Sequence, residues 1–430
     1  MKILSLKARE ILDSRGNPTI EVELETHKGK FIAGVPSGAS TGKHEALELR
    51  DGESRRNGLG VLKAVKNIEE IIAPEIINQD VISQNSLDQL ILDLDGTEKK
   101  SKLGANAMVA VSMAACRALA AEKDVPLYQY INELFNQKRE QPLALPRPCF
   151  NVINGGAHAG NDLDVQEFMV VPQADTFAEN LEIGAEVYQE LKSVLKNKIG
   201  PSAINVGDEG GFAPALKYPE EAMDFILEAS KNKGLQEKIK FILDVAASQF
   251  FENGKYKTQM GIFTGVGLAN YYFDLISKYP IIGIEDPFAE DDFDSWSLLI
   301  SRLLPIRQAG KTPAYPAGRQ VSKLAVVGDD LTVTNQQRIK LSKEKEACNG
   351  MILKINQIGT ITEALESASL AKGYEWKIIV SHRSGETGDD FISDLAVGIG
   401  AEFIKSGAPA RGERAAKYNR LLKIESELKQ

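Results

Sequence analysis

The sequence of 430 residues contains only three cysteines, and no two of them form a CxxC pair. An odd, scattered set of cysteines argues against a disulfide framework and against a zinc site. The three residues are therefore expected to be free thiols in a reducing compartment: Cys116, Cys149 and Cys348. The first apolar run is also too short for a signal-peptide core. We expect a cytoplasmic protein, and the sequence leaves open a second role at the cell surface or outside the cell.

Long apolar runs and an excess of basic residues are lacking as well. The most apolar long stretch, residues 105–122, contains Asn106, Ser112 and Arg117, so it predicts a buried helix and no membrane span. The chain carries 60 acidic and 51 basic residues, which gives a net charge of −9. Because such a surface repels nucleic acids and anionic membranes, we expect no nucleic-acid partner.

What the chain does contain is the composition of a globular protein, with 43% hydrophobic and 26% charged residues. Its length favours more than one domain. Residues 1–60 have alternating, β-rich stretches, and the apolar period becomes helical from there to about residue 135. A proline-rich segment at 142–148 then discourages a continuing helix. We predict an N-terminal α+β capping domain over 1–138 and a C-terminal catalytic domain over 139–430.

The second domain repeats short apolar runs between helical patterns. Strands that are apolar on both faces and alternate with helices are typical of a parallel sheet, and this many in series favours a β/α barrel of the TIM type. An open, doubly wound sheet is the alternative. The runs that carry this prediction are 239–245, 281–287, 324–330, 350–356, 377–383 and 402–408.

The apolar strand predicted within each of these runs ends in a charged residue. Because the carboxyl ends of barrel strands meet at one mouth, residues far apart in the sequence would share one cavity there. For a single strand, the charge more often marks only the point where the chain leaves the core, but six in succession favour a site. The residues are Asp244, Glu285, Asp329, Lys354, His382 with Arg383, and Lys405.

Three of these residues, Asp244, Glu285 and Asp329, form an all-oxygen set on successive strands, which suits a hard cation such as Mg²⁺. Without a cation, converging carboxylates repel, and at least one takes up a proton. Lys354 ends the next strand. A cation nearby would push this amine toward its neutral form, as a base requires, although a simple salt bridge to a carboxylate is an equal alternative.

The chain also resembles the enolase family along nearly its whole length. The resemblance rests on many ordered segments, which include AREILDSRGNPT at 8–19, VPSGASTG at 35–42, NVINGGAHAGN at 151–161, NVGDEGGFAP at 205–214, IEDPFAEDD at 284–292, LKINQIGT at 353–360, SHRSGET at 381–387 and GAPARGER at 407–414. A lone SGAST or GDEGG would be a weak signal. Together these segments are highly specific.

The resemblance implies a Mg²⁺-dependent lyase that interconverts 2-phosphoglycerate and phosphoenolpyruvate, with two metal ions per site. Lys354 would remove the proton from carbon 2, and Asp244, Glu285 and Asp329 would hold the first ion. Ser40 would help to hold the second. Sites of the enolase superfamily are themselves a known example of a Lys or His base that works beside one or two Mg²⁺ ions.

Further roles are implied by the same resemblance. Glu209 would be the general acid that protonates the departing hydroxyl, with Glu167 nearby and His158 on a loop that closes over the substrate. The residues that would bind the substrate are Gln166, His382, Arg383, Ser384 and Lys405. The resemblance also implies a homodimer or a larger homo-oligomer, with which an octamer is compatible.

The chain departs from the family pattern between Glu285 and Asp329. The added segment, residues 301–323, contains five basic residues and no acid. A tolerated surface loop is the preferred interpretation, because long insertions cost little closure entropy, and a contact with an anionic partner is the alternative. Two other functions remain open: a Mg²⁺-dependent lyase or racemase of the same superfamily, and a structural or surface-binding protein that has lost its activity.

Overall fold

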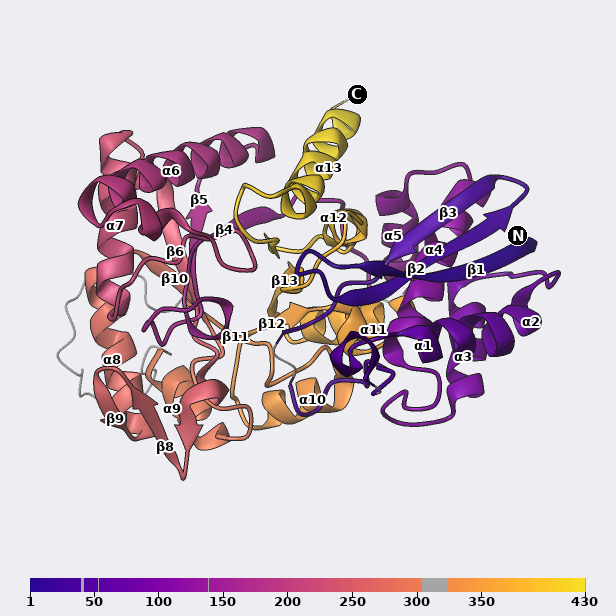
Figure 1. Ribbon diagram of the computed structural model, residues 1–430, viewed down its shortest axis with the longest axis horizontal. Coiled ribbons are helices and arrows are strands. Elements are labelled where there is room, and N and C mark those ends of the chain that lie inside the picture. The colour runs from indigo at the N-terminus through magenta and orange to yellow at the C-terminus, as the bar shows by residue number, and fades with distance from the viewer. Residues whose placement is uncertain (40–41, 53, 138, 304–323, 430) are drawn as a thin grey trace.

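The N-terminal part of the chain folds as a three-stranded antiparallel sheet covered by helices. The computed structural model describes residues 1–39, 42–52, 54–137, 139–303 and 324–429. Figure 1 shows this sheet at one end of the molecule. Its strands, in the order β1-β2-β3, are β1 Ile3–Leu12, β2 Pro18–Thr26 and β3 Gly29–Gly34. The helices are α1 Leu62–Asn67, α2 Ala73–Ile76, α3 Gln84–Asp95, α4 Ala105–Glu122 and α5 Leu127–Asn136.

Helix α4 is the central element of this part. The apolar stretch that the sequence singled out forms it, and nearly all of its residues are buried. The helix packs on β2 and β3, so its apolar side chains are covered by the sheet. Its buried Asn106 accepts a hydrogen bond from the Leu49 backbone N–H, and its Ser112 donates one to Asp88. No helix among the described residues is long and apolar enough to cross a membrane.

The C-terminal part is a closed eight-stranded barrel, as the sequence predicted. The strand order is β10-β11-β12-β13-β14-β4-β5-β6. The strands are β4 Arg147–Asn154, β5 Glu167–Pro172, β6 Ile239–Asp244, β10 Ile281–Glu285, β11 Ala325–Gly328, β12 Gly350–Leu353, β13 Lys377–Ser381 and β14 Phe403–Lys405. A separate small sheet contains β7 Phe251–Glu252, β8 Lys255–Thr258 and β9 Gly261–Phe263.

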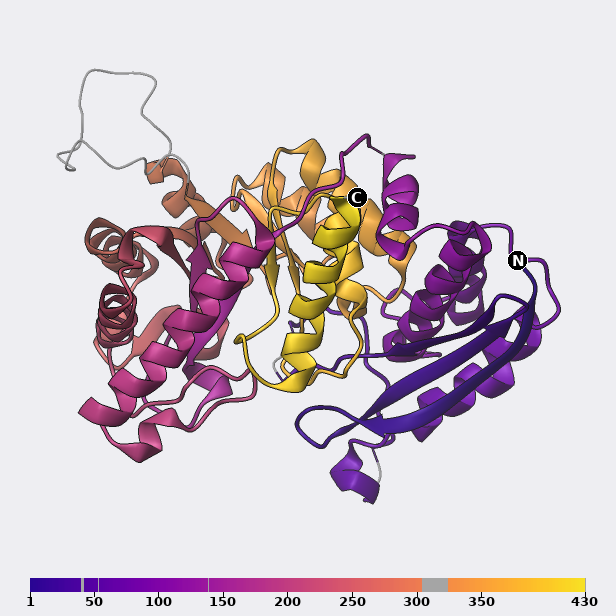
Figure 2. The same cartoon turned by 90° about the horizontal axis from the view of Figure 1, so that it is seen from above.

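Helices surround the barrel, and Figure 2 shows α6 and α13 side by side on its outside. Local signals fix their ends: at α6, Thr176 and Glu179 form a capping box that satisfies backbone N–H groups at the helix start. The helices are α6 Phe177–Lys198, α7 Pro219–Asn232, α8 Gly265–Lys278, α9 Phe293–Leu303, α10 Gln336–Glu344, α11 Ile361–Gly373, α12 Phe391–Gly398 and α13 Gly412–Leu428.

Two apolar layers hold the barrel together. Residues on alternate strand positions face opposite sides, so neighbours such as Phe168 and Met169 belong to different clusters. One cluster joins the strands to the surrounding helices. The other fills the barrel and is buried at every position: Cys149, Met169, Val171, Ile242, Ala325, Val327, Ile352 and Ile379. The barrel is therefore a packed core whose polar site is confined to its mouth.

One strand contradicts the expectation of a parallel sheet. Strand β5 runs antiparallel to both of its neighbours, β4 and β6. The segment that joins β4 to β5 contains only the short 3₁₀ turn η3 Gly156–His158, without the helical crossover that parallel neighbours require. Glu167, the first residue of β5, consequently pairs in register with Asp244, the last residue of β6.

The extra segment between Glu285 and Asp329 is described only in its first three residues. Residues 301–303 are the end of α9. The remainder of the predicted insertion, residues 304–323, lies outside the described residues, as does Ser40.

Candidate functional site

Side chains from most of the barrel strands line one cavity at the carboxyl ends of the parallel strands. Eleven of the thirteen residues that the sequence singled out line this cavity. Ser381, which the sequence did not single out, lines it as well. Glu285 contacts one of the lining residues, and Ser40 is not described. The cavity is lined by His158, Gln166, Glu167, Glu209, Asp244, Asp329, Lys354, Ser381, His382, Arg383, Ser384 and Lys405.

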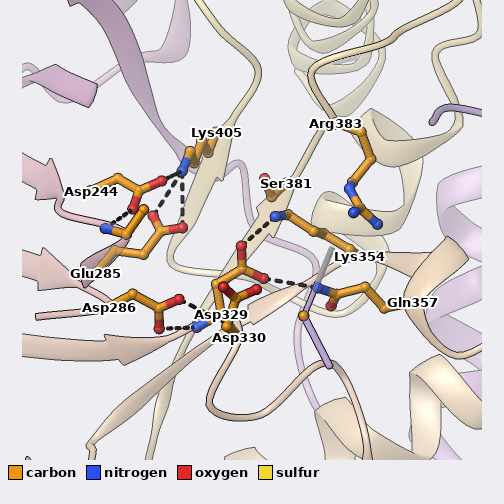
Figure 3. Close-up of polar contacts among 12 residues, drawn as sticks. Asp244, Glu285, Asp286, Asp329, Asp330, Lys354, Gln357, Ser381, Arg383 and Lys405 are labelled. Atoms are coloured by element: carbon orange, nitrogen blue, oxygen red, sulfur yellow. Dashed lines mark hydrogen bonds and ion pairs between the residues drawn. The ribbon is translucent and has the colours of Figure 1, made fainter. Parts of the chain in front are cut away.

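Three carboxylates stand side by side at this mouth because of strand register. Asp244 pairs with Glu167 on one side and with Glu285 on the other. The Lys405 ammonium lies 2.8 Å from Asp244 Oδ2, 2.9 Å from both Glu285 oxygens and 3.0 Å from Glu167. All four side chains are at most 5% exposed. Figure 3 shows the ammonium between Asp244 and Glu285, so one buried cation balances part of the charge of three acids.

A second ion pair joins the next two strands. The Lys354 ammonium donates to Asp329 Oδ2, and the other oxygen of Asp329 accepts from Gln357 Nε2 at 2.9 Å (Figure 3). Burial lowers the pKa of Lys354, but the charge of Asp329 outweighs it, and the pKa is raised. In this arrangement Lys354 is an ammonium ion. The salt bridge that the sequence left as an alternative is therefore present.

The backbone at Asp329 is fixed by a neighbouring acid. The Asp286 carboxylate accepts hydrogen bonds from the N–H groups of Asp329 and Asp330, each at 2.9 Å. These three residues bring one carboxylate oxygen each within 4.8 Å of one another. Burial raises the pKa of Asp330 to about 8, and the charge of Asp329 adds to the shift. Protons thus relieve part of the repulsion in this cluster.

The residues predicted to hold Mg²⁺ have the chemistry of a hard-cation site. Asp244, Glu285 and Asp329 offer only oxygen atoms and are buried. Burial raises the pKa of Glu285 well above its ordinary value, and the Asp244 charge adds to this effect, as expected for converging acids. A divalent cation would relieve that repulsion better than the two ammonium groups can. The donor set therefore fits the ion that the sequence predicted.

A second group of acids and histidines lies next to the first and shares Glu167 with it. His158 Nδ1 lies 3.5 Å from Glu209 and 3.8 Å from Glu167. Glu209 Oε2 accepts from Asn151 Nδ2 at 2.9 Å, and Oε1 lies 3.4 Å from His382 Nε2. The sequence placed Glu209 on a glycine-rich turn, and a Cβ at Gly207 would lie 2.4 Å from the His158 carbonyl oxygen. Only glycine lets these two loops meet there.

The surroundings move the pKa values of Glu167 and Glu209 apart. Burial raises the pKa of Glu167 well above its ordinary value, and the charge of Glu209 adds to this. Burial also acts to raise the pKa of Glu209, but the two histidines and Lys405 outweigh it and lower the pKa. Since oxygen atoms of both residues lie within 4.8 Å of each other, the pair can hold one proton between them.

A third part of the cavity presents cationic and hydroxyl groups. The Arg383 guanidinium binds both oxygens of Glu45, at 3.0 and 3.2 Å, and also donates to Asn356. Ser384 Oγ accepts from the Ala39 backbone N–H at 2.7 Å and from Arg15. The hydrogen bond from Ala39 brings the described end of the predicted SGAST loop next to Ser384.

Gln166 links the site to the following loop. Its Nε2 donates to Asp244 Oδ2 at 3.3 Å, and its Oε1 accepts from Gln249 at 2.8 Å. Several such supporting residues were not predicted from the sequence, although each lies inside or beside one of the enolase-like segments. They are Glu45, Asn151, Asp286, Gln357 and Arg414. An amide or a charge within or next to such a segment was the only signal available for them.

Comparison with known proteins gives a consistent result. Residues 3–131 match the family model described as "Enolase, N-terminal domain", and residues 142–430 match "Enolase, C-terminal TIM barrel domain". A curated protein named Enolase from Eimeria tenella is 49% identical to this chain over 444 residues. That match covers 99% of this chain and 96% of the relative.

Proposed function

The chain belongs to the enolase family, and we propose which of its residues carry out each step of the family's reaction. The protein catalyses the reversible dehydration of 2-phosphoglycerate to phosphoenolpyruvate, a lyase reaction of glycolysis. The observation that supports the proposal most is that one cavity is lined by the lysine Lys354 and by two buried glutamates, Glu167 and Glu209. A dehydration needs both a base and an acid, and these groups come from different elements.

Lys354 is the base that removes the proton from carbon 2. A base must be neutral, whereas Asp329 holds Lys354 as an ammonium ion in this structure. The role therefore requires the charge of Asp329 to be balanced by another cation, after which burial would favour the neutral amine. Asp244, Glu285 and Asp329 would hold Mg²⁺ for this purpose, and Ser40 would contribute to a second ion. When bound, the metal supplies positive charge against the negative charge that accumulates on the substrate carboxylate.

Glu209 is the acid that protonates the departing hydroxyl group, and Glu167 supplies it with a proton. The lowered pKa leaves Glu209 ionised in this structure, so its role as the acid requires a proton, and the raised pKa of Glu167, with an oxygen within 4.8 Å of one of Glu209, suits Glu167 to supply it. His158, within 4 Å of both, takes part in holding and moving that proton. Groups whose pKa values are driven apart in one site are suited to acid and base roles.

The remaining residues bind the substrate. Arg383 and Ser384 bind the phosphate, for which a planar guanidinium is well suited, and Glu45 occupies Arg383 until the phosphate replaces it. Lys405 binds the carboxylate. Gln166 and His382 complete the contacts at the same end of the cavity.

The organisation of the protein around this site is also part of the proposal. The capping domain spans residues 1–138, and the catalytic barrel spans residues 139–430. The protein acts in the cytoplasm as a homodimer or a larger homo-oligomer. Catalysis does not need the basic segment 301–323.

The test measures the ultraviolet absorbance of the enol phosphate formed from 2-phosphoglycerate. We expect turnover with Mg²⁺, loss of turnover with EDTA and recovery when Mg²⁺ is added in excess. Lys354→Ala and Glu209→Gln should each lose most turnover, whereas the surface change Glu228→Gln serves as a matched control. Turnover that survives chelation would contradict the metal assignment, and normal rates in both site variants would contradict the acid and base roles.

A further inference from the structure

Arg414, in the first turn of α13, is a fully buried arginine that contacts the backbone around the site. Its Nη1 donates to the Arg383 carbonyl at 2.7 Å, and its Nη2 donates to the carbonyls of Ser384 and Asp208 at 2.6 and 3.0 Å. A buried guanidinium is costly unless its donors are satisfied. The carbonyls that accept from Nη1 and Nη2 belong to Asp208, which precedes the proposed acid, and to the proposed phosphate-binding residues Arg383 and Ser384.

The same guanidinium also meets a histidine ring. Arg414 Nη1 lies 2.6 Å from His382 Nδ1. A guanidinium has only donors, so Nδ1 must be the acceptor and cannot carry a proton. The ring proton of a neutral His382 is then on Nε2, which lies 3.4 Å from Glu209 Oε1.

Packing leaves the ring little room to turn. The His382 side chain is 1% exposed, and a Cβ at Gly407 would lie 3.0 Å from Arg414 Cδ and 3.2 Å from His382 Cε1. Burial lowers the pKa of His382 to about 4, and the Arg414 charge contributes to this shift although Glu209 opposes it. The ring is therefore neutral at neutral pH, and one tautomer suits both of its neighbours.

We propose that Arg414 is a positioning residue that fixes His382 in the Nε2–H tautomer, so that the ring turns an N–H, and not a lone pair, toward Glu209 at 3.4 Å. In the other tautomer, a nitrogen lone pair would face a carboxylate oxygen, and the two would repel each other. Arg414 thus acts on Glu209 through His382 and through the Asp208 carbonyl. The functional importance of this arrangement rests on the proposed role of Glu209 as the acid.

The test is a ¹⁵N–¹H correlation spectrum of protein labelled at histidine, recorded at neutral pH. The chain has only four histidines, so His382→Asn identifies the signals of His382 by their disappearance. We expect the pattern of a neutral ring with its proton on Nε2. A proton on Nδ1, or a charged ring at pH 7, would overturn the proposal with the unmodified protein alone.

Three variants then connect the tautomer to catalysis. Arg414→Met removes the donors, and we expect a mixture of tautomers and a fall in kcat of roughly 10- to 100-fold, by analogy with the loss of a partner that orients a metal-ligating histidine. Arg414→Lys keeps a donor and should retain more of the Nε2–H form. Arg420→Met is the matched control, because Arg420 lies on the same helix and pairs with Asp394, which does not line the cavity.

The outcomes separate this proposal from the proposed function. A folded Arg414→Met protein with an unchanged His382 spectrum refutes the positioning role, and so does a changed spectrum in Arg420→Met. If Arg414→Met does not fold, as circular dichroism would reveal, the unmodified protein and Arg414→Lys decide the question. Absence of turnover in the unmodified protein would refute the proposed function and leave the tautomer measurement valid.

Discussion

Replacing Lys405 with methionine should destabilise the metal-free protein strongly. The side chain is buried, and its ammonium touches Asp244, Glu285 and Glu167 at 2.8 to 3.0 Å. Methionine has a similar length and no charge, so the change removes the cation with little loss of packing. The three buried carboxylates would then lose the ammonium group that balances part of their charge.

The size of the effect follows from the burial of these groups. Removing one partner of a buried ion pair costs about 3–5 kcal/mol, because the remaining charge stays buried without compensation. Unfolding entropy is about 2.1 cal/mol/K per residue, so this loss corresponds to a fall in Tm of roughly 3–6 °C if the 430 residues unfold together. Exposed ion pairs are worth much less.

The assay is thermal unfolding in EDTA and in Mg²⁺, followed by circular dichroism. If Asp244 and Glu285 are metal ligands, Mg²⁺ should raise the Tm of Lys405→Met more than that of the unmodified protein, because it replaces the missing charge. Lys423→Met is the control, since that lysine is 72% exposed and its pair with Glu427 measures 4.0 Å. A Tm within about 1 °C of the unmodified protein in EDTA would refute the reasoning on burial, and an equal response to Mg²⁺ would refute the reasoning on the ligands.

Three further results are expected. Lys354→Ala and Glu209→Gln should each reduce turnover on the order of 100- to 10,000-fold with an unchanged circular dichroism spectrum; a smaller loss would argue against direct proton transfer. His382 has a pKa of about 4 in the folded protein and near 6.5 in the unfolded chain. As the pH falls, the unfolded chain therefore takes up this proton before the folded protein does. Stability should therefore decline between about pH 6.5 and 4, by up to about 3 kcal/mol, and urea unfolding of His382→Asn should lack this part of the decline. A thiol reagent should modify none of the cysteines in the folded protein and all three in urea, because each is buried and has a raised pKa: Cys116, Cys149 and Cys348.

The charged strand ends could be predicted because strand and charge are both local features of the sequence. The strand in the run 239–245 is apolar at most positions and ends at Asp244, so the sequence shows both the buried strand and the residue at its end. The barrel follows from the number of such runs. It brings together residues such as Asp244 and Lys405, as expected.

The direction of β5 was missed because a strand that is apolar on both faces looks the same in either orientation. The available signal was the absence of a helical pattern between β4 and β5.

The supporting residues were missed for a different reason. Asn151 lies within a buried strand and Arg414 within a helix, where a polar residue gives no indication of the partner it will meet. Those partners are set by tertiary packing, which a single sequence does not display.

The ion pair of Lys354 was also undetermined by sequence. Its position after β12 left two equal alternatives, a base beside a cation and a salt bridge to a carboxylate. Lys354 can act as a base only when another cation balances the charge of Asp329, and otherwise it is the counter-ion of Asp329. Which of the two applies depends on what the site has bound, and the sequence does not show that. The structure has the counter-ion arrangement.

The order of strands around the barrel determines when the site can exist during synthesis of the protein. The barrel closes where β14, the last strand, pairs with β4, the first, through contacts such as Phe403 with Arg147. Lys405 is the final residue of β14, and Arg414 follows it in the next helix. A chain emerging from the ribosome therefore exposes its row of acids long before it possesses their ammonium partner. Domains tend to fold as units as they leave the ribosome, so the first domain can form early. The acids Glu167, Asp244 and Glu285 gain their ammonium partner only after the last strand has been synthesised.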